Sequence, residues 1–216
     1  MKHSPILIDF EGLDCSFKET NSKKLAEHLN AKRYEFPNYS SESSYFVRQF
    51  LSGKYKDIEG ADHIMLAYLM EMFDVWNTKV LPDIKNGLEI VIFDRFWYSN
   101  LYYQCKSHRD RIALQIIVNE LKLPNCNMMF KMITDFNLTM KKIKEKNSKD
   151  ILESDESNMR KVHNRFSKCK FASVPYVEEI LTYNNGEFRN EDEIFNEIVS
   201  KFFDAYNSDK LIGTVI

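Results

Sequence analysis

A glycine and a lysine near the start of the chain have the spacing of a phosphate-binding loop. Gly12 and Lys18 lie in the stretch FEGLDCSFKET, residues 10–20, directly after a short apolar run. The pattern G-x-x-x-x-G-K-[ST] surrounds phosphates with backbone N–H groups, and its lysine binds the β- and γ-phosphate oxygens. Here Phe17 replaces the second glycine, and Glu19 replaces the hydroxyl that helps to hold Mg²⁺. The stretch predicts a P-loop that departs from its pattern at two positions.

Both departures bear on whether this loop binds phosphate. If position 17 requires a positive φ, a bulky Phe17 costs about 1–2 kcal/mol, and its side chain can crowd the phosphate. Glu19 can ligate Mg²⁺, yet it also brings negative charge close to the phosphates. The alternative interpretation is that Lys18 is a solvated lysine in the first turn of a helix.

A second pair of charged residues follows the most apolar stretch of the chain. Asp94 and Arg95 come directly after LEIVIF, residues 88–93. An acid in this position can orient Mg²⁺ or its waters, and a guanidinium offers a planar fork suited to phosphate. The alternative is an ion pair that caps the strand.

These residues require strands that deliver them to one edge of a sheet. Apolar runs and turn signals predict strands at about 6–10, 32–36, 88–93, 128–134 and 177–183. Helical spacing predicts helices at about 22–29, 44–52, 63–85, 98–106, 110–121, 137–146, 156–168 and 192–206. The alternation predicts a three-layer α/β P-loop fold, with a central five-stranded parallel sheet flanked by helices on both faces. Ligands of such sheets bind outside the carboxyl ends of the strands.

Three boundary features accompany this prediction. Asp135 is expected to cap the helix that follows it, and Asn185-Gly186 is expected to form a turn. Pro82 is expected to kink or end the helix at 63–85. Residues 146–155 are polar and lysine-rich, which is typical of a loop.

The bulk properties favour one soluble domain. The 216 residues have 44% hydrophobic and 29% charged side chains, with a net charge of -2, so we expect neither nucleic acid nor a membrane as a partner. Asp9 and Glu11 interrupt the early apolar run, which excludes a signal peptide, and no stretch reaches the length of a membrane span. The four cysteines lack the spacing of a metal site, and we expect them to be reduced thiols. We expect a cytoplasmic protein whose single domain spans 1–216.

Taken together, the motifs resemble those of the thymidylate kinase family. FEGLD is followed by K-x-T at the right distance, then by FPNY and by DRFWYSNLYYQ. The family carries F-E-G-x-D-x-x-G-K-[ST]-T, then F-P with an arginine close behind, then D-R-[YF]-x-x-S-x-x-A-Y-Q. Its lid pattern, R-G-x-x-D-R-x-E, is similar to KNSKDILE at 146–153, which predicts a lid at about 146–156. The similarity spans nearly the whole chain in order and spacing.

The resemblance implies ATP and Mg²⁺ as cofactors, nucleotides as partners, and a homodimer. It places ATP at Gly12, Asp14, Cys15, Ser16, Phe17, Lys18, Glu19 and Thr20. It places the nucleoside monophosphate at Asp14, Phe36, Tyr39, Tyr68, Met72, Arg95, Ser99, Tyr103 and Gln104. The implied catalytic residues are Lys18, Asp94 and Arg95, and the implied metal ligands are Glu19 and Asp94.

Individual roles follow from the same resemblance. Asp14 would hold the deoxyribose hydroxyl or the nearby phosphate-binding geometry, and Arg95 would bind the phosphate of the acceptor. Tyr68 falls where the family places an aromatic that stacks on the base. A core aromatic on an amphipathic helix is the alternative for Tyr68.

Several positions depart from the family, and we interpret them as losses of phosphate-binding groups. Tyr39, Met72 and Ile151 stand where the family has arginines, in addition to Phe17 and Glu19. One lost electrostatic donor can cost about 10²–10³ in rate. The cations that could compensate are Lys141, Lys142, Lys149, Arg160 and Arg165, although a lysine run is usually a solvated face.

Three functions remain open on these grounds. The leading hypothesis is a kinase that moves the γ-phosphoryl of ATP to dTMP or a related (deoxy)nucleoside monophosphate, with an activity that these departures can impair. The first alternative is a nucleotide-binding pseudo-enzyme that has lost the transfer chemistry. The second is a kinase with a changed acceptor, such as a nucleoside or another phosphorylated small molecule.

Overall fold

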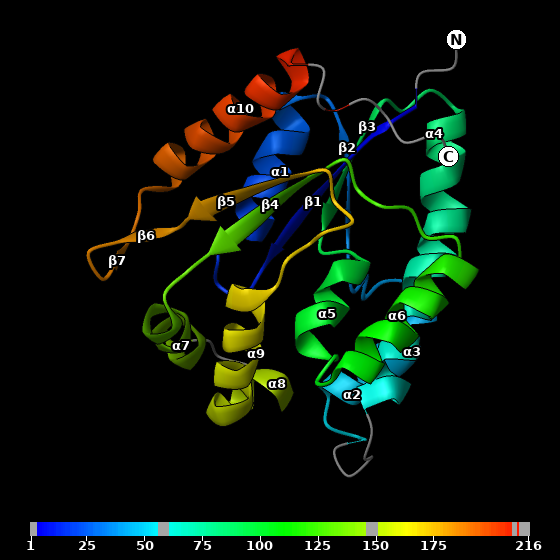
Figure 1. Ribbon diagram of the computed structural model, residues 1–216, viewed down its shortest axis with the longest axis vertical. Helices are drawn as coiled ribbons and strands as arrows, with labels where there is room; N and C mark the ends of the chain where they lie inside the picture. The colour runs from blue at the N-terminus through cyan, green and yellow to red at the C-terminus, as the bar shows by residue number, and fades with distance from the viewer. Residues whose placement is uncertain (1–3, 56–60, 146–150, 209–210, 212–216) are drawn as a thin grey trace.

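The central feature is a parallel sheet of five strands (Figure 1). The computed structural model describes residues 4–55, 61–145, 151–208 and 211. The strand order is β2-β3-β1-β4-β5, and all four pairings are parallel. The strands are β1 Ile6–Gly12, β2 Lys32–Glu35, β3 Ile90–Asp94, β4 Met128–Ile133 and β5 Tyr176–Leu181. The predicted five-stranded parallel sheet is confirmed.

Strand β1 occupies the centre because both of its edges are paired and both of its faces are buried. Leu7 belongs to one apolar cluster and Ile8 to the other, since successive side chains point to opposite faces. The two clusters are the cores between the sheet and its two helical layers, so the three-layer arrangement is confirmed.

The helices divide between the two faces of the sheet. The long helices α1 and α10 contact each other on one face (Figure 1). Helices α3, α6 and α9 contribute Leu69, Leu114 and Val162 to the core on the other face. The helices are α1 Lys18–His28, α2 Tyr45–Leu51, α3 Ala61–Val75, α4 Leu81–Lys85, α5 Asn100–Tyr103, α6 His108–Glu120, α7 Phe136–Glu145, α8 Ile151–Ser154, α9 Glu156–Lys168 and α10 Glu191–Asn207.

Short elements complete the chain. Single 3₁₀ turns η1 Glu42–Ser44 and η3 Trp97–Ser99 precede α2 and α5. The hairpin of β6 Tyr183–Asn184 and β7 Glu187–Phe188 lies between β5 and α10. Its turn is Asn185-Gly186, with φ angles of 49° and 80°, so the predicted turn is confirmed.

The predicted helix at 63–85 is continuous through Pro82, with a π-helical segment before it. The segment η2, Trp76–Val80, joins α3 to α4. Proline lacks an N–H and its ring clashes with the carbonyl four residues earlier, and a π turn relieves both problems. Two side chains of the π segment bond back to carbonyls of α3: Asn77 Nδ2 donates to Phe73 O at 2.7 Å, and Thr78 Oγ1 donates to Asp74 O at 2.8 Å.

Three predicted boundaries differ from the structure, and one cap is confirmed. The helix expected at 98–106 is the turn η3 followed by α5, which ends at Tyr103. Helix α1 begins at Lys18, not at Ser22, so Lys18 itself is in the first turn. Part of the predicted loop at 146–155 is helix α8, while 146–150 lies outside the described residues. Asp135 Oδ1 accepts hydrogen bonds from the N–H groups of Asn137 and Leu138, at 2.9 and 3.0 Å, as expected of a cap.

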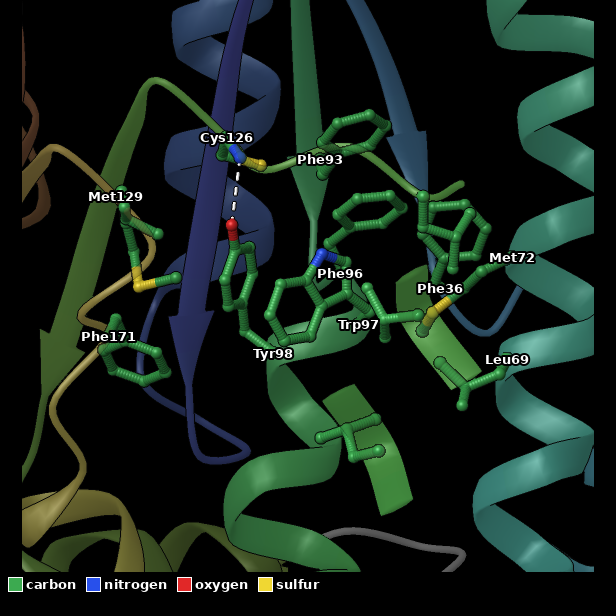
Figure 2. Close-up of a cluster of buried hydrophobic side chains, with 14 of the residues drawn as sticks. Phe36, Leu69, Met72, Phe93, Phe96, Trp97, Tyr98, Cys126, Met129 and Phe171 are labelled. Atoms are coloured by element: carbon green, nitrogen blue, oxygen red, sulfur yellow. Dashed lines mark hydrogen bonds between the residues drawn. The ribbon is translucent and has the colours of Figure 1, made fainter. Parts of the chain in front are cut away.

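An aromatic core lies between the sheet and α3 (Figure 2). Phe93 and Phe96 stack with ring centroids 4.4 Å apart, and the Tyr98 hydroxyl accepts a hydrogen bond from Cys126 N–H at 2.9 Å. None of the four cysteines, all within the described part, forms a disulfide. No helix in that part is long and apolar enough to cross a membrane.

Candidate active site

The predicted P-loop joins the buried end of β1 to the first turn of α1. Gly12 has no room for a side chain, because a Cβ there would lie 2.5 Å from Ser16 Oγ and 2.9 Å from Met132 O. The loop therefore closes tightly on the sheet, and α1 begins immediately behind it at Lys18. A helix N-terminus at the end of a central parallel strand is suited to an anion.

Phe17 adopts the backbone conformation that the missing glycine would supply. Its φ is 62°, in the left-handed region, and Cys15 is left-handed as well at 59°. The expected strain at Phe17 is therefore present in the loop. The ring packs edge-on against Phe188 of the β6–β7 hairpin, with centroids 5.2 Å apart.

Lys18 is largely shielded from solvent at the loop, with 11% of its side chain exposed, and it is bonded to the loop. Its Nζ donates to Leu13 O at 3.3 Å and lies 3.6 Å from Asp14 Oδ1. Burial and the nearby Arg95 lower the pKa of Lys18, while Asp14 opposes them. A partly desolvated ammonium held by weak contacts can exchange them for phosphate oxygens.

Arg95 bridges the P-loop and α5. One guanidinium nitrogen donates to Gly12 O at 2.8 Å and to the Tyr102 hydroxyl at 2.9 Å. The other donates to Asp14 Oδ1 at 2.8 Å and to the Tyr103 hydroxyl at 3.3 Å. Arg95 is thus fixed next to the loop, where it can meet an acceptor phosphate.

Glu11 organises the site, although the sequence reasoning assigned it no role. Its Oε1 accepts from Phe96 N–H at 3.1 Å, and its Oε2 accepts from Ser99 Oγ at 2.7 Å and from the Tyr102 hydroxyl at 2.5 Å. Burial raises the pKa of Glu11, against the opposing effects of Arg95 and of these hydrogen bonds. An acid inside an otherwise apolar strand was the available signal, since such a group needs partners.

The two expected metal ligands have protein partners. Glu19 is exposed and its Oε1 lies 2.5 Å from Lys23 Nζ, and Asp94 Oδ2 accepts from Arg33 at 2.6 Å. Among the described residues no cluster of three or more acidic, histidine or cysteine side chains could hold a metal ion. Mg²⁺ commonly binds one or two carboxylates together with substrate phosphates. The donor set therefore fits a metal that arrives with a nucleotide.

One pocket contains all nine residues expected around the nucleoside monophosphate. Apolar side chains from the β2 end, α2, α3 and α8 face polar ones from the P-loop, Arg95 and α5. The lining residues are Asp14, Phe36, Pro37, Tyr39, Leu51, Tyr68, Met72, Arg95, Ser99, Asn100, Tyr103, Gln104 and Leu152. Pro37, Leu51, Asn100 and Leu152 were not predicted. We call this the acceptor pocket.

A second pocket lies on the other side of the P-loop. Its lining contains every expected ATP residue except Gly12, and adds one residue each from α7, β7 and α10. The lining residues are Asp14, Cys15, Ser16, Phe17, Lys18, Glu19, Thr20, Lys142, Phe188 and Glu191. We call this the donor pocket. Asp14 lines both pockets, so they meet at the P-loop.

Of the candidate compensating cations, Lys142 is the one in the described residues that lines a pocket. Arg165 is committed to α5, because it donates to Tyr102 O at 2.7 Å and to Tyr103 O at 3.3 Å. Arg160 lies over the Phe136 ring. Lys149 and the side chain of Ile151 lie outside what the structure describes.

The fold and the loop define an α/β protein of the P-loop class, with two pockets that meet at the loop. The chain belongs to the thymidylate kinase family, since the model of that family, "Thymidylate kinase", matches residues 10–195. The family expected from the sequence motifs is thereby confirmed.

Individual relatives agree with this assignment. A probable thymidylate kinase of Methanocaldococcus jannaschii is 28% identical over 201 residues, covering 90% of this chain and 94% of that protein. A thymidylate kinase of Leptospira borgpetersenii is 31% identical over 122 residues, 55% of this chain and 57% of that protein. The thymidylate kinase structure from Ehrlichia chaffeensis shares the fold at 17% identity, with a TM-score of 0.68 over 92% of this chain and 99% of that one.

Proposed function

We propose that this protein transfers the γ-phosphoryl group of ATP to dTMP or a related deoxynucleoside monophosphate. The observation that carries the proposal is the meeting of the two pockets at Asp14, with Lys18 on the donor side and Arg95 on the acceptor side. The family match supports this substrate pair. Direct in-line transfer suits the arrangement, because positioning and charge suffice and no covalent intermediate is required.

On the donor side, the P-loop N–H groups and Lys18 bind the β- and γ-phosphates. Mg²⁺ brought by ATP would neutralise charge on these oxygens, with Asp94 as the carboxylate that holds its waters. Lys142 lines the same pocket and supplies a second positive charge. It offsets part of the loss at the lid position of Ile151.

On the acceptor side, Arg95 binds the phosphate and Asp14 meets the sugar. Tyr68 and Phe36 form apolar walls suited to a base, while Gln104 offers an amide that can read its edge. Arg95 already donates to Asp14 and to two tyrosines, so it is oriented before the nucleotide arrives. Preorganised charge is the main means by which such a site lowers the barrier.

A coupled assay for ADP release, run over the common nucleoside monophosphates, tests the proposal. We expect turnover with dTMP and its loss in Lys18→Ala. Absence of turnover with every monophosphate, from well-folded protein, would contradict the proposal. A thermal shift with dTMP but none with Mg-ATP would instead identify a nucleotide-binding pseudo-enzyme.

The assembly and location are further parts of the proposal. Exposed apolar side chains on α3 and α6 suit a homodimer, in which a second copy covers them: Leu66, Met70, Ile112 and Ile116. A cytoplasmic location is consistent with four cysteines without disulfides. We also propose one domain over 1–216 with a lid at about 146–156, of which 146–150 lies outside the described residues.

A further inference from the structure

One wall of the acceptor pocket is the turn after β2, residues 36–39, which we call the acceptor wall. Phe36, Pro37 and Tyr39 line the pocket. The first residue of the wall is anchored to the sheet, because Phe36 N–H donates to Asp94 O at 3.0 Å. Its ring is buried against Phe93 and Phe96, with centroids 6.2 and 5.8 Å away (Figure 2).

The other end of the acceptor wall is anchored by a buried acid on α3. Glu71 is fully buried, and one of its carboxylate oxygens accepts a hydrogen bond from Asn38 N–H. Its Oε2 is also buried and has no hydrogen-bond partner among the described residues. A buried carboxylate with one unmatched oxygen is costly to a fold, so its retention calls for a role beyond packing.

Glu71 sits on the helix that forms the opposite wall. Tyr68 and Met72, which line the pocket, are three residues before it and one after it on α3. The Asn38–Glu71 hydrogen bond therefore fixes the separation of the two walls. Arg48 of α2 holds the turn from outside, donating to Tyr39 O at 2.8 Å and to Ser41 O at 2.7 Å.

We propose that Glu71 is a positioning residue for the acceptor nucleotide, which holds the acceptor wall against α3 through the Asn38 N–H. This inference rests on the proposed kinase function, because it concerns the affinity for the acceptor. Glu71 touches no substrate itself, since it does not line the pocket. Its effect is expected in the KM for the acceptor, not in the KM for ATP.

The charge of Glu71 gives the inference a signature that a purely structural residue lacks. Burial, with a contribution from Asp74 on the same helix, raises the pKa of Glu71 to about 7, while the Asn38 N–H and Arg48 from α2 oppose that shift. Because the pKa of Glu71 is raised when the wall is closed over it, the closed wall holds the Glu71 proton better than a solvated carboxyl would. The wall is therefore held less firmly as pH rises from 6 to 8, and the acceptor KM rises relative to a variant that does not titrate.

Two substitutions separate the hydrogen bond from the charge. Glu71→Leu removes both, and Glu71→Gln keeps an oxygen that accepts from Asn38 N–H but does not titrate. Val75→Ala is the matched control, because Val75 is buried on the same helix and lines neither pocket. Each variant is assayed as full-length protein with dTMP and Mg-ATP between pH 6 and 8.

Glu71→Leu is expected to raise the dTMP KM about tenfold and to leave the ATP KM within about twofold, as the loss of one charge-assisted hydrogen bond implies. Glu71→Gln is expected to stay closer to wild type. The ratio of wild-type to Glu71→Gln KM should change with pH, and this ratio cancels the titration of the nucleotide phosphate. An acceptor KM that Glu71→Leu changes no more than Val75→Ala, or a pH-independent ratio, overturns the inference.

The inference about Glu71 can be tested separately from the proposed kinase function. If wild type turns over no monophosphate, the amide exchange rate of Asn38 replaces KM as the readout. The inference then requires faster exchange at Asn38 as pH rises through 7, after correction for intrinsic exchange, in wild type but not in Glu71→Gln. Equal corrected exchange rates at Asn38 in wild type and in Glu71→Gln overturn the inference. This comparison does not use Glu71→Leu, so it tests the inference even if that variant does not fold.

Discussion

Phe17 is the residue that most directly limits the P-loop. It holds a left-handed φ of 62° that glycine would adopt without cost, and its ring lies on the wall of the donor pocket against Phe188. The backbone at position 17 thus keeps the conformation that a glycine would adopt. Phe17, however, fills space that a glycine would leave open, and its backbone is strained where that of a glycine would not be. The departure changes the energy of the loop more than its shape.

Phe17→Gly is expected to bind Mg-ATP several-fold more tightly, because it opens the donor pocket without moving the backbone. Relief of about 1–2 kcal/mol of strain is offset by lost ring packing and by the flexibility of glycine in the unfolded chain, so stability should change little. Isothermal titration with Mg-ATP measures the affinity, with Phe188→Leu as the control for the lost ring contact. Weaker ATP binding in Phe17→Gly would contradict this account.

Arg33 is expected to compete with the metal for Asp94. The two side chains pair at 2.6 Å, and Arg33 also donates to Ser22 Oγ at 2.8 Å. Arg33→Gln should release the carboxylate and lower, several-fold, the Mg²⁺ concentration needed for half-maximal activity. The thermal shift given by ATP should also depend more strongly on Mg²⁺.

Lys32→Gln is the matched control for Arg33→Gln. Lys32 lies on the same strand, and its ion pair is with Asp83, away from the site. An unchanged Mg²⁺ requirement in Arg33→Gln would show that Asp94 does not serve the metal.

Among the secondary-structure elements, β1 is unusual because it contains two buried acidic side chains. Asp9 and Glu11 lie on one face of this central strand, and both are fully buried. Glu11 has three donors, whereas neither carboxylate oxygen of Asp9 has a hydrogen-bond partner within the described residues. Burial, followed by the charge of Glu11, raises the pKa of Asp9 well above its usual range.

Asp9→Asn should therefore reduce the pH dependence of stability. Above about pH 3.9 the unfolded chain loses the Asp9 proton, while the folded protein keeps it. Wild type thus loses stability as pH rises, by at most about 1.4 kcal/mol per pH unit from this group. Urea unfolding between pH 5 and 8 should show the stability of Asp9→Asn gaining on wild type as pH rises.

The control for Asp9→Asn is Asp192→Asn, the same substitution at an exposed acid on α10. Parallel pH profiles for wild type and Asp9→Asn would show that Asp9 ionises as readily in the folded protein as in the unfolded chain.

The helices and strands were largely predictable from local sequence signals. The side-chain contacts between elements that are distant in sequence were not. Apolar runs placed all five sheet strands, and the family motifs placed nine residues around one pocket. The pairing of Asp94 with Arg33 depends on which strand lies beside β3, and the bond from Asn38 to Glu71 depends on how α3 crosses the turn. Such contacts arise from tertiary packing, which spacing along one chain does not encode.

At the scale of the whole molecule, the exposed apolar side chains of α3 and α6 predict association. Met70 and Ile116 are 51% and 56% exposed, and they lie on helices that contact each other. A contiguous apolar patch on a protein surface is typical of an interaction site. Charged substitutions within it should therefore disrupt a dimer.

Met70→Glu with Ile116→Glu is expected to convert a dimer to a monomer in light scattering at micromolar concentration. Tyr206→Glu, on the exposed surface of α10, is the control and should leave the mass unchanged. A wild-type protein that is monomeric at these concentrations would contradict the dimer proposal.

We propose that a P-loop with altered residues still transfers phosphate between two pockets that meet at Asp14. The most direct test follows the labelled γ-phosphoryl group of ATP with dTMP as acceptor, in wild type and in Lys18→Ala. We expect labelled dTDP from wild type, and at least about a hundredfold less from Lys18→Ala, because a phosphate-binding charge is lost. The absence of labelled dTDP from folded wild-type protein, or equal amounts from both proteins, would contradict it.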